Sequence, residues 1–126
     1  MKKINSIFKN IFQIVNLILI ILYLYPGSIL GWFFYGNIKK QPQITSDFII
    51  SLNHFYAFFI LTFLGVLAYR GSEKINLLKK YVFLLSILLE LLHFVIPERS
   101  FQLSDLSGNI FGFAVIFFLF KIFKKN

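Results

Sequence analysis

Long runs without a charged side chain constrain this chain more than any other feature of its sequence. No Asp, Glu, Lys or Arg occurs in 10–38, 48–69 or 106–120. A helix needs about 20 apolar residues to cross the ~30 Å hydrocarbon core of a bilayer, and fewer when flanking lysines reach the headgroups. Of the 126 residues, 58% are apolar and only 14% are charged. Because so few polar residues cannot cover a soluble domain of this size, the apolar surplus must face lipid.

The sequence therefore predicts an all-α membrane protein with a single domain over residues 1–126. Its four predicted spans are 11–25, 48–69, 81–96 and 105–121. Pro26 and Gly27 end the first span, because proline cannot continue a helix. The aromatic residues that follow, Trp32 to Tyr35, indicate a short interfacial helix.

The distribution of Lys and Arg predicts the orientation. Ten of them lie in the N-terminal tail, the segment 70–80 and the C-terminal tail, against three in the opposite loops: Lys39, Lys40 and Arg99. By the positive-inside rule both termini are cytoplasmic, and the loops 26–47 and 97–105 face outward. The net charge of +8 is then a topology signal, and no nucleic-acid partner is expected, because the basic residues are divided among three segments beside lipid-sized runs. The richness in Ile, Phe, Lys and Asn favours an AT-rich, bacterial source, so we expect a multi-pass protein of a bacterial cytoplasmic membrane.

Ionisable and amide side chains gather at one level of the predicted spans. His54 lies near the outer end of the second span, Glu90 and His93 near that of the third, and Asp105 and Asn109 at the outer start of the fourth. An ionisable side chain at the bilayer centre costs about 2.5 to 3.5 kcal/mol, so each needs a partner, water or a function. This level is the candidate functional site.

Each of these residues also has a structural interpretation. Glu90 and His93 are three residues apart on one helical face, so they can bond to one another. Their spacing is also half of a di-iron motif, but the chain has a single copy, and we expect no metal. His54 can serve as an interfacial ring with one wet edge. Arg99 can pair with Glu90, with Asp105 or with an external anion, or can simply extend to the headgroups.

The start of the fourth span carries a narrow face of small and polar residues. Asp105, Gly108, Asn109 and Gly112 follow helical spacing on an otherwise apolar helix. Gly108 and Gly112 form a G-x-x-x-G pair, which permits the close approach of another helix. This pair predicts helix packing, either within the chain or between two copies of it.

The order of these residues resembles the VanZ-like family of small bacterial membrane proteins, named for a teicoplanin-resistance protein. The matching positions are His54, Glu90, Pro97, Arg99, Asp105, Asn109 and Gly112, within about 51–120. His93 stands where the family usually has glutamine, a poor metal ligand, which favours a hydrogen-bonding role at that position. The resemblance implies resistance to glycopeptides or other envelope-directed antibiotics.

These observations lead to a binding hypothesis. The polar level is expected to bind an anionic envelope component, such as a lipid-linked cell-wall precursor, with Arg99 holding its phosphate or carboxylate and Asp105 and Asn109 orienting Arg99 or the ligand. Membrane lipids are the other expected partners, and neither a cofactor nor a catalytic residue is expected. The alternatives are a proton-coupled small multidrug-type transporter using Glu90, a lipid-headgroup enzyme using a histidine base, and a structural subunit without a ligand.

Overall fold

The computed structural model describes residues 2–43 and 50–124, and this part of the chain contains five α-helices, one 3-10 helix and no strand. The elements in chain order are α1 (Lys2–Leu24), α2 (Ile29–Tyr35), α3 (Leu52–Tyr69), α4 (Ile75–Leu91), η1 (Leu92–Phe94) and α5 (Leu103–Lys124). The predicted all-helical class is confirmed for these residues.

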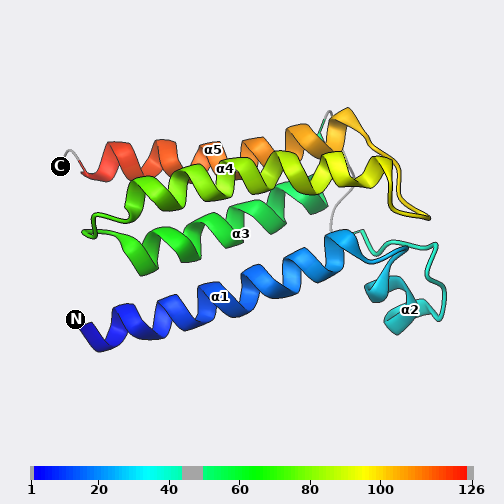
Figure 1. The fold of residues 1–126 in the computed structure, drawn as a ribbon, viewed down its shortest axis with the longest axis horizontal. Coiled ribbons are helices and arrows are strands. Elements are labelled where there is room, and N and C mark those ends of the chain that lie inside the picture. Colours follow the sequence, from blue (N-terminus) through cyan, green and yellow to red (C-terminus); the bar gives the residue numbers. More distant parts are fainter. Residues whose placement is uncertain (1, 44–49, 125–126) are drawn as a thin grey trace.

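The four longer helices run side by side in alternating directions (Figure 1). α3 packs against α5 and α1, and α4 packs against α5. α1 begins and α5 ends at the same end of this bundle, which we call the terminal end. The opposite end carries α2, η1 and residues 95–102, and we call it the loop end.

Within 2–43 and 50–124, three helices are long and apolar enough to cross a membrane, in the segments Ser6–Leu24, Leu52–Tyr69 and Leu103–Phe123. The outer surface of the bundle is also apolar: Leu17 of α1, Leu84 of α4 and Phe118 of α5 are each more than half exposed. Water would not tolerate such a continuous apolar surface on a monomer, whereas lipid would. By length and composition the chain is a membrane protein.

Two helices extend beyond their predicted spans. α1 begins at Lys2 rather than at residue 11, and α4 begins at Ile75 rather than at residue 81, so Lys79 and Lys80 are helical. Charged residues mark where a chain leaves the hydrocarbon, but a helix can continue into the headgroups because it satisfies its own backbone hydrogen bonds. These two helices therefore begin before the predicted spans without contradicting them, because a span is only the part of a helix inside the hydrocarbon.

The remaining boundaries differ by less. The predicted second span begins at 48, but 48 and 49 lie outside the described residues and α3 begins at Leu52. The third predicted span ends at 96, whereas α4 ends at Leu91 and tightens into η1 before Pro97. α5 exceeds the predicted 105–121 by two residues at its start and three at its end.

The short helix predicted after Pro26 is α2. Gly27 reverses the chain at φ +103°, and the Ser28 hydroxyl caps α2 by accepting from the Gly31 N–H at 2.9 Å. The helix ends at Gly36, whose φ of +66° is the left-handed conformation that glycine adopts without strain. α2 thus forms a small cap at the loop end, with exposed aromatic rings.

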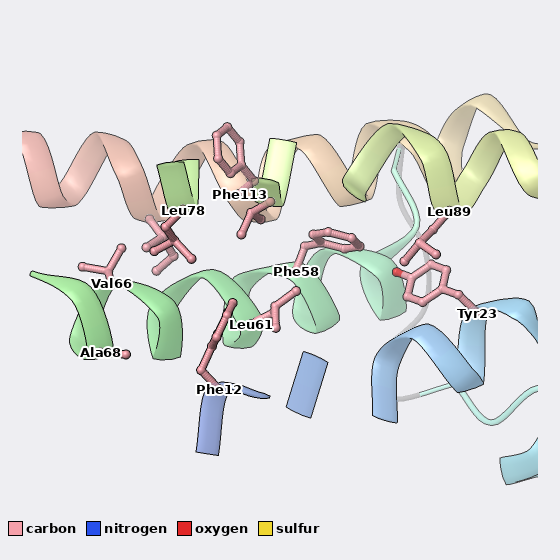
Figure 2. Close-up of a cluster of buried hydrophobic side chains, with 11 residues drawn as sticks. Phe12, Tyr23, Phe58, Leu61, Val66, Ala68, Leu78, Leu89 and Phe113 are labelled. Carbon is pink, nitrogen blue, oxygen red and sulfur yellow. The ribbon is translucent and has the colours of Figure 1, made fainter. Parts of the chain in front are cut away.

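Aromatic and aliphatic side chains from all four long helices fill the centre of the bundle (Figure 2). Phe58 and Leu61 of α3 and Val82 of α4 have no exposed surface, and Phe12 of α1 closes the core from the other side. Tyr23 of α1 lies at the edge of this core and points its hydroxyl away from its own helix. The apolar core therefore gives way to polar contacts toward the loop end.

Gly108 and Gly112 set the distance between α5 and α3. A Cβ atom on Gly112 would lie 2.5 Å from the Phe55 carbonyl oxygen and 2.8 Å from the Phe59 nitrogen, and one on Gly108 would strike the Ser51 carbonyl oxygen. The glycine face of α5 is thus occupied by α3 of the same chain. A second copy of the chain would have to use a different face.

Candidate functional site

The six predicted site residues meet at the loop end of the bundle. His54 lies in the first turn of α3, Glu90 in the last turn of α4, and His93 in η1. Asp105 and Asn109 occupy the first two turns of α5. Arg99 lies in the loop that joins η1 to α5, and it lines the same cavity as His54, His93 and Asp105.

Asn109 is the centre of the hydrogen-bond network. Its side chain is fully buried, and its Nδ2 donates to the Ser86 carbonyl oxygen of α4 at 2.9 Å. This bond orients the amide, so Oδ1 faces the other way and accepts from the Tyr23 hydroxyl at 2.8 Å. Oδ1 also lies 3.1 Å from His54 Nδ1. One amide therefore ties α1, α3 and α4 to α5.

This network fixes the tautomer of neutral His54. The amide oxygen of Asn109 can only accept, so His54 Nδ1 must carry the hydrogen in their 3.1 Å contact. The lone pair of the neutral ring is then on Nε2, which lies 3.7 Å from Asp105 Oδ1. His54 Nδ1 is also 3.8 Å from Glu90 Oε2. His54 thus stands between two carboxyl groups from two other helices.

Glu90 and His93 form the pair that their spacing predicts. His93 Nε2 lies 2.9 Å from the Tyr23 carbonyl oxygen, an acceptor, so this nitrogen carries a hydrogen. On the other side of the ring, Nδ1 lies 3.2 Å from Glu90 Oε1, which also accepts from the backbone N–H of Gln102 at 3.1 Å. Glu90 Oε1 is therefore shared between the His93 ring and the backbone of Gln102.

The second carboxyl oxygen of Glu90, Oε2, lacks the hydrogen bonds that Oε1 makes. The side chain has no exposed surface, and Oε2 has no hydrogen-bond partner among the described residues. A buried acceptor without a partner costs about 1 to 3 kcal/mol, and more when it is charged. This oxygen points toward His54, at the 3.8 Å given above.

Arg99 is held by the end of α1. Its Nη2 donates to the Leu22 carbonyl oxygen at 2.6 Å and its Nε to the Tyr25 carbonyl oxygen at 3.1 Å. The last carbonyl groups of a helix have no partner within the helix, so the guanidinium satisfies that of Leu22, together with that of Tyr25 just after the helix, and complements the negative helix end. The side-chain hydrogen bonds of Arg99 thus go to the end of α1 and not to Glu90 or Asp105. Asn109 was expected to orient Arg99, but its own hydrogen bonds go to other groups.

Arg99 remains a cation in this position. Partial burial lowers the pKa of its guanidinium, and the negative charge of Glu90 opposes that shift. The pKa of arginine is so high that the group stays protonated at neutral pH. Two of its five N–H donors face the two carbonyl groups, which leaves donor capacity for another acceptor.

A cavity of about 630 Å³ lies beside these residues at the loop end. The residues that line it include Tyr23, His54, His93, Arg99 and Asp105 together with 28–30 and 41–43. A volume of this size holds a small molecule or a lipid headgroup. The site is thus a cavity with one fixed cation and several acceptors.

A second cavity, of about 710 Å³, lies at the terminal end between α3 and α5. Its walls are aromatic and aliphatic side chains together with Arg70 and Gly71. Such walls suit lipid acyl chains, and Arg70 is the charged side chain among the residues that line them. The chemistry of the molecule is concentrated at the loop end.

Tyr23 is the main site residue that the sequence did not reveal. Its hydroxyl binds Asn109, its ring meets the His54 ring edge-on at 4.9 Å, and it stacks on the His93 ring at 6.1 Å between centroids. In the sequence it is one of two tyrosines at the end of an apolar run, where tyrosine is common at any membrane interface. No local signal distinguishes it from Tyr25.

Compared with known protein families, characterised proteins and solved structures, the chain has no significant match.

Proposed function

We propose that this chain is a VanZ-like protein of the bacterial cytoplasmic membrane that binds an anionic cell-envelope component in the loop-end cavity. A lipid-linked cell-wall precursor, which combines a phosphate with a polyprenyl chain, fits a polar cavity at the end of an apolar bundle. Binding of this kind would contribute to resistance against glycopeptides or other envelope-directed antibiotics. The residues that resemble the family, from His54 to Gly112, support this assignment.

We further propose four spans with both termini in the cytoplasm. α4 has 17 residues, or about 25 Å of helix, and η1 extends it by a further turn. α4 lies alongside α5 in the bundle, with the exposed apolar side chains Leu84 and Leu88 on its surface. The ten-to-three excess of basic residues toward the terminal end supports the orientation.

The observation that carries the binding proposal is the placement of Arg99. The two α1 carbonyl groups hold its guanidinium at the wall of the cavity, so little side-chain entropy remains to be lost when an anion binds. Guanidinium groups bind phosphate and carboxylate oxygens through paired hydrogen bonds. A fixed cation at the outer surface of the membrane is a suitable receptor for a lipid phosphate.

The test uses the purified protein in nanodiscs of neutral lipid and a labelled polyprenyl phosphate as the probe. Arg99→Gln removes the charge but keeps an amide that can donate to the α1 carbonyl groups. Loss of a charge-assisted hydrogen bond is worth about 1.5 to 3 kcal/mol, so we expect affinity to fall by about tenfold or more.

Lys40→Gln is the matched control. This substitution removes the same charge from the same end of the molecule, but the Lys40 Nζ lies over the Tyr35 ring at 4.4 Å, outside the cavity wall. We expect the affinity of this variant for the probe to stay within about twofold of the wild type, because loss of the Lys40 charge changes only the screened surface potential. Equal losses in both variants, or no loss in Arg99→Gln, would contradict specific binding by Arg99.

A parallel experiment addresses the biological role. Bacteria that express the wild type, Arg99→Gln or Lys40→Gln at equal membrane levels are compared for susceptibility to glycopeptides and lipopeptides. We expect protection from the wild type and Lys40→Gln only. Protection that persists in Arg99→Gln would contradict the link between the cavity and resistance.

A further inference from the structure

Three side chains from three helices surround one point at the loop end. A nitrogen of His54 and one carboxyl oxygen each from Glu90 and Asp105 lie within 4.8 Å of one another. They come from the start of α3, the end of α4 and the start of α5. This grouping differs from the Glu90–His93 pair that the sequence suggested, because His93 is turned toward α1.

The hydrogen bond to Asn109 leaves one nitrogen of the His54 ring free to face Asp105. Asn109 fixes the Nδ1 hydrogen, so in the neutral ring the Nε2 lone pair faces the oxygen of Asp105 across 3.7 Å. Two acceptors that face each other repel unless a proton or a metal ion lies between them. The histidines that bind metals usually donate their second ring N–H to an oxygen, as His54 does to Asn109.

Glu90 supplies an independent observation. Its Oε2 is fully buried and has no hydrogen-bond partner among the described residues, although it faces His54. Its other oxygen is occupied by Gln102 and His93, which hold the carboxyl group in place. This buried oxygen is available as a ligand for a cation, although its 3.8 Å contact is with His54 Nδ1, so it must move toward Nε2 to share an ion with Asp105.

We propose that His54, Glu90 and Asp105 bind a divalent transition-metal ion of the zinc type. Zn²⁺ lies about 2.1 Å from nitrogen and oxygen ligands, so in a tetrahedral site two donor atoms are about 3.4 Å apart, and the widest pair must close by up to about 1.4 Å. One imidazole and two carboxylates suit Zn²⁺ better than Mg²⁺ or Ca²⁺, which prefer oxygen ligands alone. Three protein ligands leave a coordination position open.

The open position faces the cavity, because His54 and Asp105 both form part of its wall. The metal site does not depend on the proposed phosphate ligand: an ion held by three side chains of this chain binds with or without an anion above it. An anion in the cavity would then meet two positive groups, the ion and Arg99.

The experiment measures metal binding directly, with no lipid ligand present. The full chain, freed of any histidine tag, is stripped with a chelator in neutral detergent and titrated with Zn²⁺, and Co²⁺ serves as a visible-absorption probe of the coordination. We expect one ion per chain. We also expect weaker binding of Mg²⁺ and Ca²⁺ than of Zn²⁺.

Asp105→Asn is the principal variant, because Asp105 is only partly buried and its replacement keeps the shape of the side chain. Glu90→Gln and His54→Gln follow, each checked for an unchanged thermal midpoint without metal. Loss of a ligand should weaken binding by at least the tenfold that follows loss of a second-sphere partner. Glu98→Gln is the matched control, since Glu98 lines the same cavity outside the trio, and we expect a change below about twofold.

Three results would overturn the proposal. The first is a folded wild type that binds no Zn²⁺ above the level of the buffer. The second is equal affinity for Zn²⁺, Mg²⁺ and Ca²⁺, which would exclude a nitrogen ligand. The third is a loss in Glu98→Gln as large as that in Asp105→Asn, which would indicate diffuse attraction by acidic groups.

Discussion

The close contact between α5 and α3 gives the sharpest test of the fold, through the substitution Gly112→Leu. The first added atom alone, the Cβ, would lie 2.5 Å from the Phe55 carbonyl oxygen, against at least 3.4 Å for an ordinary contact. The two helices must therefore separate by about 0.9 Å, and a gap of that size removes a quarter to a half of the dispersion energy of the atoms that face each other. The obstacle is backbone, which cannot turn aside as a side chain can.

The expected loss in the free energy of unfolding of Gly112→Leu follows from two opposing effects. Overpacking a core costs typically 1 to 3 kcal/mol, and a rigid backbone obstacle belongs at the upper end, about 3 kcal/mol. Leucine forms a helix better than glycine by about 1 kcal/mol, which offsets part of that cost. We expect a net loss of about 2 kcal/mol in the free energy of unfolding, which corresponds to roughly 5 to 10 °C in the thermal midpoint of a chain this size.

The assay is thermal unfolding of the purified protein in a mild detergent, followed by size-exclusion chromatography. Ala114→Leu is the matched control, because it places the same side chain on the exposed face of the same helix. Its midpoint should stay within about 2 °C of the wild type, since surface changes usually cost less than 0.5 kcal/mol. If Gly112→Leu melts as the wild type does, or if Ala114→Leu falls equally, the α3–α5 contact described above is wrong.

Three further predictions address the network, the core and the topology. Tyr23→Phe removes a buried donor to Asn109 and should cost about 1 kcal/mol in the free energy of unfolding, whereas Tyr81→Phe, whose hydroxyl bonds to Asn16 at the exposed surface, should cost less; equal costs would contradict the network. Thr62→Val should raise the thermal midpoint, because the Thr62 hydroxyl is fully buried and has no partner among the described residues; a lowered midpoint would indicate a partner for that hydroxyl. The sequence has no cysteine, so Ser100→Cys and Ser72→Cys can be probed in intact cells with a membrane-impermeant maleimide. Labelling of Ser100→Cys alone is expected, and labelling of Ser72→Cys alone would reverse the proposed orientation.

Some of the candidate site could be predicted from the sequence. The positions of His54, Glu90 and Asp105 along their spans place them at one level, because helical rise converts residue number into depth. The pairing of Glu90 with His93 follows from the turn of a single helix. Both predictions depend on geometry within one helix, which is nearly the same in every protein.

The partners of Arg99 and Tyr23 could not be predicted in the same way. Arg99 reaches the carbonyl groups of Leu22 and Tyr25, more than 70 positions away, and Tyr23 reaches Asn109 over 86 positions. These contacts depend on which helices are neighbours and on how each is rotated about its axis. Hydropathy does not specify either property.

The sequence by itself determined that this is a helical membrane protein with its polar groups at one depth. The free energy of transferring each residue from water into lipid depends on that residue, and these free energies add along the chain. Only the tertiary structure decided that the amide of Asn109 orients His54 between two carboxyl groups, and that Glu90 keeps one oxygen without a partner. Hydrogen bonds act over about 3 Å and in fixed directions, so they form only after side-chain packing has set the distance and rotation of the helices.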